Sequence, residues 1–98
     1  PLIGVGTFAS RSVAVSCTGL GEYFMLAGAA RDVEARVTYA GAPLAEAALA
    51  SLDAVARLGG DGGLVAIDAS GEIAMPFNSP GMKRASVREG ERAIVKVF

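Results

Sequence analysis

Histidine is absent from this sequence of 98 residues, and cysteine occurs only once, at Cys17. A zinc site built from histidine and cysteine therefore has too few ligands, and a serine–histidine–aspartate relay has no base. A single cysteine cannot form a disulfide within the chain, and no histidine is present to activate the Cys17 thiol as a nucleophile. We therefore expect Cys17 in the hydrophobic core, and we expect neither a metal nor a cofactor.

Charged residues are also scarce, at 19% of the chain, compared with about 25% in an average globular protein. The net charge is -1, and the basic residues are scattered apart from Lys83 and Arg84, so we expect no nucleic-acid partner. The longest apolar stretch, residues 23–30, is shorter than the roughly 20 residues that cross a membrane, and no signal peptide is recognisable. These features predict a soluble, cytoplasmic protein with no membrane partner.

Apolar residues, by contrast, are abundant: they make up 52% of the chain, and the mean hydropathy is +0.45. A chain of this length forms one domain at most, so we treat residues 1–98 as a single unit. Such an apolar excess in a small domain indicates that part of its surface is covered by a partner. One interpretation is therefore a non-catalytic interaction subunit.

Turn residues divide the sequence into runs with β-strand and helical patterns of apolar residues. Pro43 predicts the start of a second helix, as its first helical residue, and the Gly59-Gly60 pair predicts its end. Between them, apolar residues recur at the 4-4-3 spacing of one helix face, at Leu44, Ala48, Leu52 and Val55. The expected elements are strands at 5–9 and 13–17, a helix over 21–39, a second helix from Pro43 to Gly59-Gly60, and strands at 64–68, 72–77 and 93–98. This order predicts an α+β fold in which an antiparallel sheet carries two helices on one face.

The segment "SCTGLGE", residues 16–22, stands between an expected strand and an expected helix. The first N–H groups of a helix have no partner within the helix, so this junction attracts negative charge. Gly19 and Gly21 let another atom approach the backbone closely, and the Thr18 hydroxyl adds a donor, which together resemble an oxyanion hole. The alternative is structural: Thr18 caps the helix and the glycines ease the turn.

Two motifs in the same order resemble one known family. The sequences "SVAVSCTGLGE" and, about forty residues later, "GGDGGLVAIDASGEIAMPFNSPGM" are similar to the small subunit of plant-type asparaginases, also called isoaspartyl peptidases. The resemblance is densest over residues 4–22 and 59–82. It implies half of the four-layer αββα sandwich of N-terminal-nucleophile hydrolases. In this family a precursor cleaves itself to expose a threonine, which attacks a side-chain amide with its own α-amine as base and forms an acyl-enzyme.

This resemblance assigns roles to three residues of the first motif. Thr18, through its hydroxyl, and Gly19, through its backbone N–H, correspond to the donors of the oxyanion hole. Gly21, through its carbonyl, corresponds to the contact for the α-amine of the substrate. Leu20 departs from the family pattern and changes the shape of the pocket, so the choice between L-asparagine and β-aspartyl peptides stays open.

The nucleophilic threonine of the family has no counterpart here, because the sequence begins at Pro1 and no residue before Gly4 is a threonine. We therefore expect residues 1–98 to form the C-terminal part of the β subunit, inactive alone. The expected partners are the upstream α subunit, the nucleophile-bearing segment of the β subunit and a second copy in an (αβ)2 assembly.

Three other interpretations rest on single features. Pro1 resembles the catalytic base of N-terminal-proline tautomerases, with Arg11 as a possible acid partner. The segment "GVGTFA", residues 4–9, imitates a dinucleotide fingerprint but has no strand before it. The segment "GGDGG", residues 59–63, has no following Lys-Ser/Thr and is better interpreted as a helix stop and tight turn than as a phosphate loop.

Overall fold

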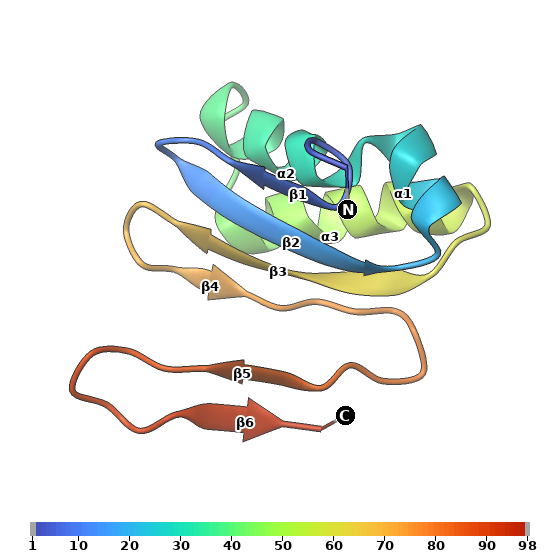
Figure 1. Ribbon diagram of the computed structural model, residues 1–98. Coiled ribbons are helices and arrows are strands. Elements are labelled where there is room, and N and C mark those ends of the chain that lie inside the picture. The colour runs from blue at the N-terminus through green and yellow to red at the C-terminus, as the bar shows by residue number, and fades with distance from the viewer. Residues whose placement is uncertain (1, 98) are drawn as a thin grey trace.

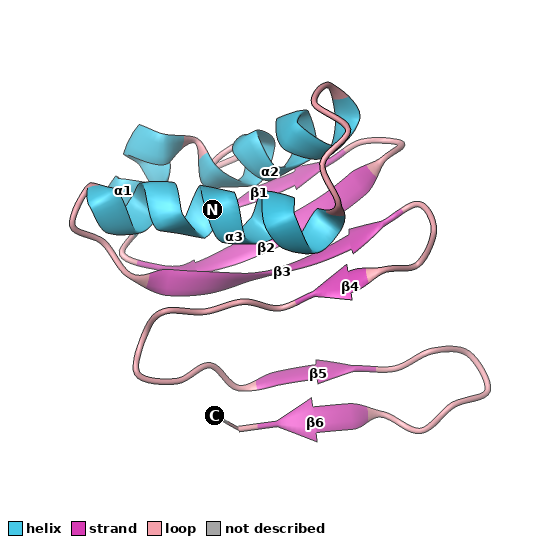
Figure 2. Ribbon diagram, turned by 180° about the vertical axis from the view of Figure 1, so that it is seen from behind, coloured by secondary structure: helices cyan, strands magenta, loops and turns pink. Residues whose placement is uncertain are grey.

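The computed structural model describes residues 2–97, which form three helices and six strands. In chain order these are β1 (Thr7–Ala9), β2 (Val13–Gly19), α1 (Gly21–Ala27), α2 (Ala29–Thr38), α3 (Leu44–Arg57), β3 (Gly62–Asp68), β4 (Ile73–Ala74), β5 (Arg84–Ser86) and β6 (Ile94–Lys96). The first four strands form an antiparallel sheet in the order β1-β2-β3-β4, and β5 pairs with β6 in a separate hairpin. All three helices lie on one face of the four-stranded sheet (Figures 1 and 2). The predicted α+β fold, with helices on one face of an antiparallel sheet, is confirmed.

The core lies between this sheet and its helices because side chains alternate along each strand. Val13 and Val15 of β2 are buried, and Leu64 and Ala66 of β3 are buried beside them. Small residues of α2 and α3 let both helices approach the sheet, and Ser51 of α3 donates a hydrogen bond to the Ala29 carbonyl oxygen at 2.9 Å. The apolar spacing that predicted the second helix is confirmed, since its four positions are all buried: Leu44, Ala48, Leu52 and Val55.

The opposite face of the sheet carries no helix. Its side chains are small or apolar, and the large ones remain accessible: Val65 is 40% exposed and Ile67 is 46% exposed. With the neighbouring hairpin they border a groove of about 490 Å³. We call this surface the open face; it includes Thr7, Ala9, Ala14, Ser16, Val65, Ile67, Ile73 and Met75.

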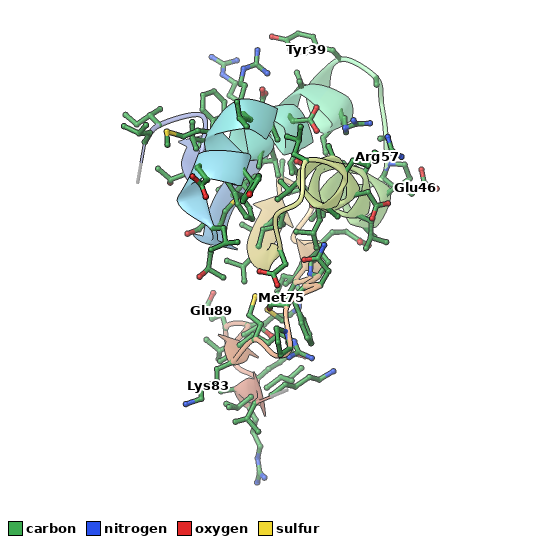
Figure 3. The ribbon with its side chains drawn as sticks, turned by 90° about the vertical axis from the view of Figure 1, so that its right-hand side faces the viewer. Tyr39, Glu46, Arg57, Met75, Lys83 and Glu89 are labelled. Carbon is green, nitrogen blue, oxygen red and sulfur yellow. The ribbon has the colours of Figure 1, made fainter. Side chains whose placement is uncertain are left out.

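The β5–β6 hairpin extends beyond β4, away from the helices. In the side view, Lys83 lies on the far side of Met75 from Tyr39 (Figure 3). Every residue of β6 is exposed, including Ile94 at 57% and Val95 at 67%. None of the helices described is long and apolar enough to span a membrane.

Several predicted boundaries are wrong. The helix expected over 21–39 is two helices, because Gly28 adopts a left-handed conformation (φ 57°) and ends α1. Pro43 occupies the N-cap position of α3, so Leu44 is the first helical residue. The strand expected over 72–77 is regular only at 73–74, with a single further bridge between Gly63 and Phe77.

The C-terminal strand also differs from its prediction. It spans 94–96 and pairs with β5, a strand that the sequence did not predict. The interpretations that involve Pro1, and the predicted end of the last strand at Phe98, lie outside the described residues.

Candidate functional site

The junction between β2 and α1 brings together all three predicted site residues. Thr18 and Gly19 are the last two residues of β2, and Gly21 is the first residue of α1. Across the sheet, Thr18 pairs with Gly63 and Gly19 pairs with Gly62 at the start of β3. The Thr18 side chain is exposed and follows Ala14 and Ser16 onto the open face, since every second residue of a strand shares a face.

Thr18 does not cap the helix, so the structural alternative for this residue is wrong. The N-cap position of α1 is held by Leu20, which makes no side-chain capping bond. The Leu20 carbonyl oxygen instead accepts the N–H groups of Tyr23 and Phe24, at 3.1 and 3.4 Å. Two residues, Gly19 and Leu20, separate Thr18 from the helix and leave its hydroxyl free of any capping role.

Gly19 and Gly62 are glycines because the two strand ends approach each other beneath the Phe24 ring. Gly19 has φ 142°, which disfavours any other residue. A Cβ atom on Gly19 would collide with the Asp61 carbonyl oxygen and lie 2.8 Å from Phe24 Cε1. A Cβ atom on Gly62 would collide with the Thr18 carbonyl oxygen. Only backbone atoms fit between β2 and β3 at this point.

The Gly19 N–H lies on the β1 side of β2, beyond Thr7, where β1 begins. The Cys17 N–H donates to the Gly6 carbonyl oxygen at 2.8 Å, on that same side. Backbone groups alternate in direction along an antiparallel strand, so the N–H of Gly19, two residues further on, takes the same direction. The chain before β1 has turned away there, with the Val5 N–H donating to the Leu2 carbonyl oxygen.

These groups border a hollow of about 420 Å³ at the junction. We call it the junction hollow; its lining residues are Leu2, Val5, Gly6, Cys17, Thr18, Gly19, Gly21, Phe24 and Met25. Its walls are mostly apolar, and Thr18 is the one residue with a side-chain hydroxyl among the described residues that line it. A Cβ atom on Gly21 would meet nothing within 4 Å, so the space beside this residue is open.

Cys17 does not act as a nucleophile in this hollow. Its side chain is partly buried and packs against both clusters of core residues. Burial raises the pKa of its thiol to about 11, so the thiol stays protonated near neutral pH. The prediction that Cys17 belongs to the core is confirmed.

The chemistry available in the junction hollow is therefore hydrogen-bond donation. Among the described residues that line it, no side chain is a carboxylate, imidazole or amine that can serve as a base. Among residues 2–97, no three acidic, cysteine or histidine side chains are grouped to hold a metal ion. A hydroxyl and a directed backbone N–H in an apolar setting suit a developing oxyanion, because a low dielectric strengthens such donors.

Sequence reasoning gave no role to Asn78, which the structure places against this junction. The Gly62 N–H donates to Asn78 Oδ1 at 2.9 Å, and the Asn78 N–H donates to the Gly62 carbonyl oxygen at 2.8 Å. Asn78 belongs to the second motif, "FNSPGM", and the resemblance of that motif was the available signal.

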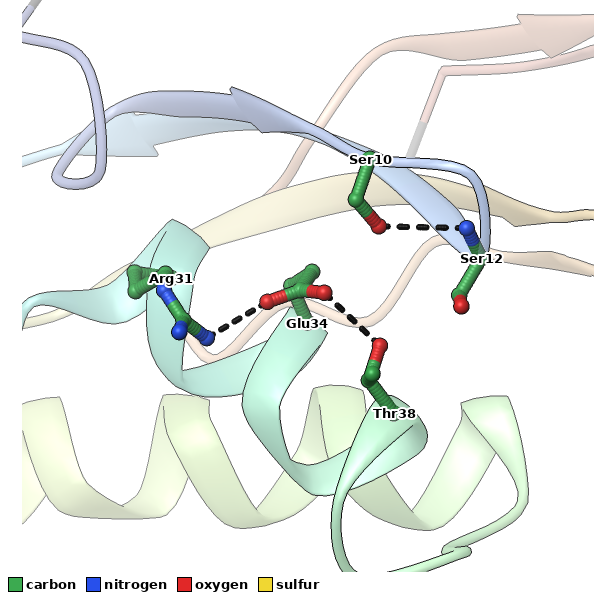
Figure 4. A network of polar contacts seen from close by, with 5 residues as sticks. All are labelled: Ser10, Ser12, Arg31, Glu34 and Thr38. Carbon is green, nitrogen blue, oxygen red and sulfur yellow. Dashed lines mark hydrogen bonds and ion pairs between the residues drawn. The ribbon is translucent and has the colours of Figure 1, made fainter.

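A second polar cluster surrounds Glu34 on α2, away from the junction hollow (Figure 4). Glu34 is only 4% exposed, and it accepts hydrogen bonds from Thr38 Oγ1 at 2.7 Å and from Arg31. The hydrogen bond from Thr38 is the main cause that holds the pKa of Glu34 below its usual value; Ser10 and the charge of Arg31 add to it, against the effect of burial. The Arg31 guanidinium also lies over the rings of Phe8 and Tyr39. This cluster ties α2 to the β1–β2 turn and is structural.

Comparison with known proteins identifies one family. The sequence model of the asparaginase family matches residues 1–97. The chain is 52% identical over 100 residues to an isoaspartyl peptidase of Escherichia coli (strain K12), covering all of this chain and 31% of that protein. It is 49% identical over 100 residues to an isoaspartyl peptidase of Salmonella typhimurium, covering all of this chain and 32% of that protein.

A plant protein is similar over almost the same range. The chain is 47% identical over 92 residues to a probable isoaspartyl peptidase/L-asparaginase 2 of Arabidopsis thaliana, covering 91% of this chain and 27% of that protein. The chain thus spans about a third, or less, of the length of the curated relatives that it matches.

Proposed function

The chain belongs to the asparaginase family, and from this premise we propose that it works as part of an amidohydrolase. The proposed substrates are L-asparagine, whose side-chain amide is cleaved, and β-aspartyl peptides, whose isopeptide bond is the same kind of amide. The observation that carries this proposal is the meeting of Thr18, Gly19 and Gly21 in one hollow. The names of the relatives support both substrates and do not choose between them.

In the proposed reaction, the hydroxyl of an N-terminal threonine outside these residues attacks the side-chain carbonyl of the substrate. The carbonyl oxygen becomes an oxyanion, which accepts hydrogen bonds from the Thr18 hydroxyl and the Gly19 N–H. The α-amine of the threonine takes up the hydroxyl proton and passes it to the leaving nitrogen, so ammonia leaves from L-asparagine and an amine leaves from a β-aspartyl peptide. Water then hydrolyses the resulting ester, which frees the threonine and releases aspartate. The Gly21 carbonyl holds the α-amine of the substrate, so the donors and this acceptor fix the substrate at both ends.

The remainder of the enzyme covers the surfaces that this chain leaves open. The open face is apolar and exposed at Val65 and Ile67, which suits a second sheet packed against it in an αββα sandwich. The junction hollow borders the same face through Thr18, so a segment packed there can carry the nucleophile to the donors. We assign these parts to the upstream α subunit and the first part of the β subunit, within an (αβ)2 assembly.

The test is Thr18→Val in the complete enzyme. Valine keeps the shape and the β-branching of threonine but lacks the hydroxyl, so the proposal expects kcat to fall by about 10²–10³-fold with a modest change in KM. Ser16→Ala is the matched control, because it removes a hydroxyl from the same face of β2 outside the junction hollow.

Two measurements accompany the kinetics. Intact mass shows whether the precursor has been cleaved, since an unprocessed enzyme is inactive for a different reason, and the melting temperature shows whether the variant is folded. An unchanged kcat in a folded, processed Thr18→Val enzyme would remove Thr18 from the site.

A further inference from the structure

The segment at residues 76–82 lies against the two strand residues that face Thr18 and Gly19. Gly63 pairs with Thr18 and Gly62 pairs with Gly19 across the β2–β3 ladder. The same two glycines contact residues 76–82 on their other side. This segment belongs to the second motif of the sequence, and the chemistry proposed above gives it no role.

Gly62 is held to Asn78 by a reciprocal pair of hydrogen bonds, which we call the Asn78 clasp. The Gly62 N–H donates to Asn78 Oδ1 at 2.9 Å, and the Asn78 N–H donates to the Gly62 carbonyl oxygen at 2.8 Å. Gly62 has no side chain of its own to pack, and its backbone lies directly between Gly19 and Asn78. The clasp is therefore the constraint on Gly62 from the side opposite Gly19.

Packing fixes the rest of the segment against Gly63. A Cβ atom on Gly63 would lie 2.5 Å from Met82 Sδ and 2.8 Å from Phe77 Cβ, so these side chains cover the glycine closely. The Leu64 N–H donates to the Pro76 carbonyl oxygen at 3.0 Å. At the far end, Arg84 donates to the Met82 carbonyl oxygen at 2.8 Å. The segment is anchored before and after Asn78, so the Asn78 side chain is presented to Gly62 from a fixed position.

We propose that Asn78 is a positioning residue of the hydrolase, which fixes the direction of the Gly19 N–H through Gly62. This inference rests on the proposed function. Gly19 and Gly62 face each other without side chains, and glycine has the widest backbone freedom of any residue. Without the clasp, Gly62 can shift, and Gly19 shifts with it because both are held in one ladder beneath Phe24. A displaced donor weakens the transition state more than the bound substrate.

The test compares three substitutions in the complete enzyme. Asn78→Ala removes the acceptor of the Gly62 N–H, and we expect kcat to fall by about 10-fold to 100-fold while KM changes less than about twofold. Asn78→Asp keeps an Oδ1 acceptor at the same place and is expected to recover most of kcat. Ser79→Ala is the matched control, because it deletes a hydrogen bond in the same segment, from Ser79 Oγ to the Gly81 carbonyl oxygen, that does not touch Gly62.

A merely structural role gives a different result. Loss of stability alone lowers the melting temperature and the folded fraction, but kcat per folded, processed molecule stays at the wild-type value in Asn78→Ala; that outcome would overturn the inference. If Asn78→Ala does not fold, Asn78→Ser keeps a polar side chain that is too short to reach Gly62 and is measured in its place. A wild-type kcat in that variant overturns the inference equally.

Thr18→Val separates this inference from the proposed function. If the unmodified enzyme hydrolyses neither L-asparagine nor a β-aspartyl dipeptide, or if Thr18→Val leaves kcat unchanged, the proposed function fails and the role of Asn78 fails with it. If Thr18→Val loses activity while Asn78→Ala has the same kcat as Ser79→Ala, only the role of Asn78 is wrong. Loss of kcat in Thr18→Val and Asn78→Ala, with recovery in Asn78→Asp, supports both.

Discussion

Two glycines of the opening motif differ at the residue scale, although the sequence presents them as a pair. Gly19 has φ 142° and no room for a Cβ atom, whereas Gly21 starts a helix with open space beside it. We predict that Gly19→Ala lowers the free energy of unfolding by about 1–3 kcal/mol, through collision with Asp61 and Phe24. Gly21→Ala is expected to change it by less than about 0.5 kcal/mol. Urea denaturation of the complete enzyme measures both.

The substitutions Gly19→Ala and Gly21→Ala also separate an effect on stability from an effect on substrate binding. If the Gly21 carbonyl holds the substrate α-amine, the added methyl group of Gly21→Ala stands in the hollow and raises KM in an enzyme of normal stability. Equal losses of stability in the two variants would contradict the packing that we describe around Gly19. An unchanged KM in Gly21→Ala would argue against the contact assigned to Gly21.

Thr18 shows why residue type alone left two interpretations open. A threonine just before a helix is a common N-cap, and nothing in "SCTGLGE" says how far β2 continues. The structure extends β2 through Gly19 and gives the cap position to Leu20. Because Thr18 has no capping bond to lose, an effect of Thr18→Val on kcat can be attributed to the site.

At the scale of elements, long periodic segments were predictable and short ones were not. The four buried positions of α3 follow the apolar spacing in the sequence. β2 and β3 contain the runs of β-prone residues that predicted strands at 13–17 and 64–68. Gly28 stands inside a continuous helical pattern, so the apolar spacing does not change at the break between α1 and α2 and could not predict it. β5 has three residues and exists through its pairing with β6, which no local pattern encodes.

The Glu34 cluster on α2 makes the protein sensitive to acid. The pKa of Glu34 lies below its usual value of 4.5, so the folded state holds this proton less tightly than the unfolded chain does. Its contribution to stability is therefore complete above pH 4.5 and is lost as the pH falls through the lower pKa of the folded state. We predict that Glu34→Gln flattens the rise of unfolding free energy with pH at and below pH 4.5.

Asp68 provides the comparison for this measurement. Hydrogen bonding from Ser70 lowers the pKa of Asp68 as well, so some acid sensitivity must remain in Glu34→Gln and decrease further when Asp68→Asn is added. Urea denaturation at several pH values gives, for each variant, the slope of the unfolding free energy against pH. A slope in Glu34→Gln equal to that of the unmodified protein would show that the cluster does not hold Glu34 ionised.

For the molecule as a whole, the candidate site depends on contacts between distant parts of the chain. The donors belong to β2, their cross-strand partners belong to β3, and Asn78 lies 16 residues beyond Gly62. The sequence predicted the strands and, by resemblance, the donors, but the register that places Gly62 opposite Gly19 is a property of the folded sheet. The resemblance marks the second motif as a whole, but the contact between Asn78 and Gly62 could not be predicted, because residue types do not show which side chain bonds to a glycine backbone.

The chain alone, residues 1–98, is predicted to hydrolyse neither L-asparagine nor a β-aspartyl dipeptide. Its junction hollow holds the donors that we propose for the oxyanion, but no base is present among the described lining residues, and the Cys17 thiol stays protonated. The measurement compares ammonia or amino-acid release by purified residues 1–98 with release by the complete enzyme at the same molar concentration. Turnover by residues 1–98 that is lost in Thr18→Val would show that the nucleophile lies within this chain, contrary to our proposal. Activity in the complete enzyme only, lowered there by about 10²–10³-fold in Thr18→Val, is the expected result, because the proposed mechanism takes its nucleophile from a segment outside residues 1–98.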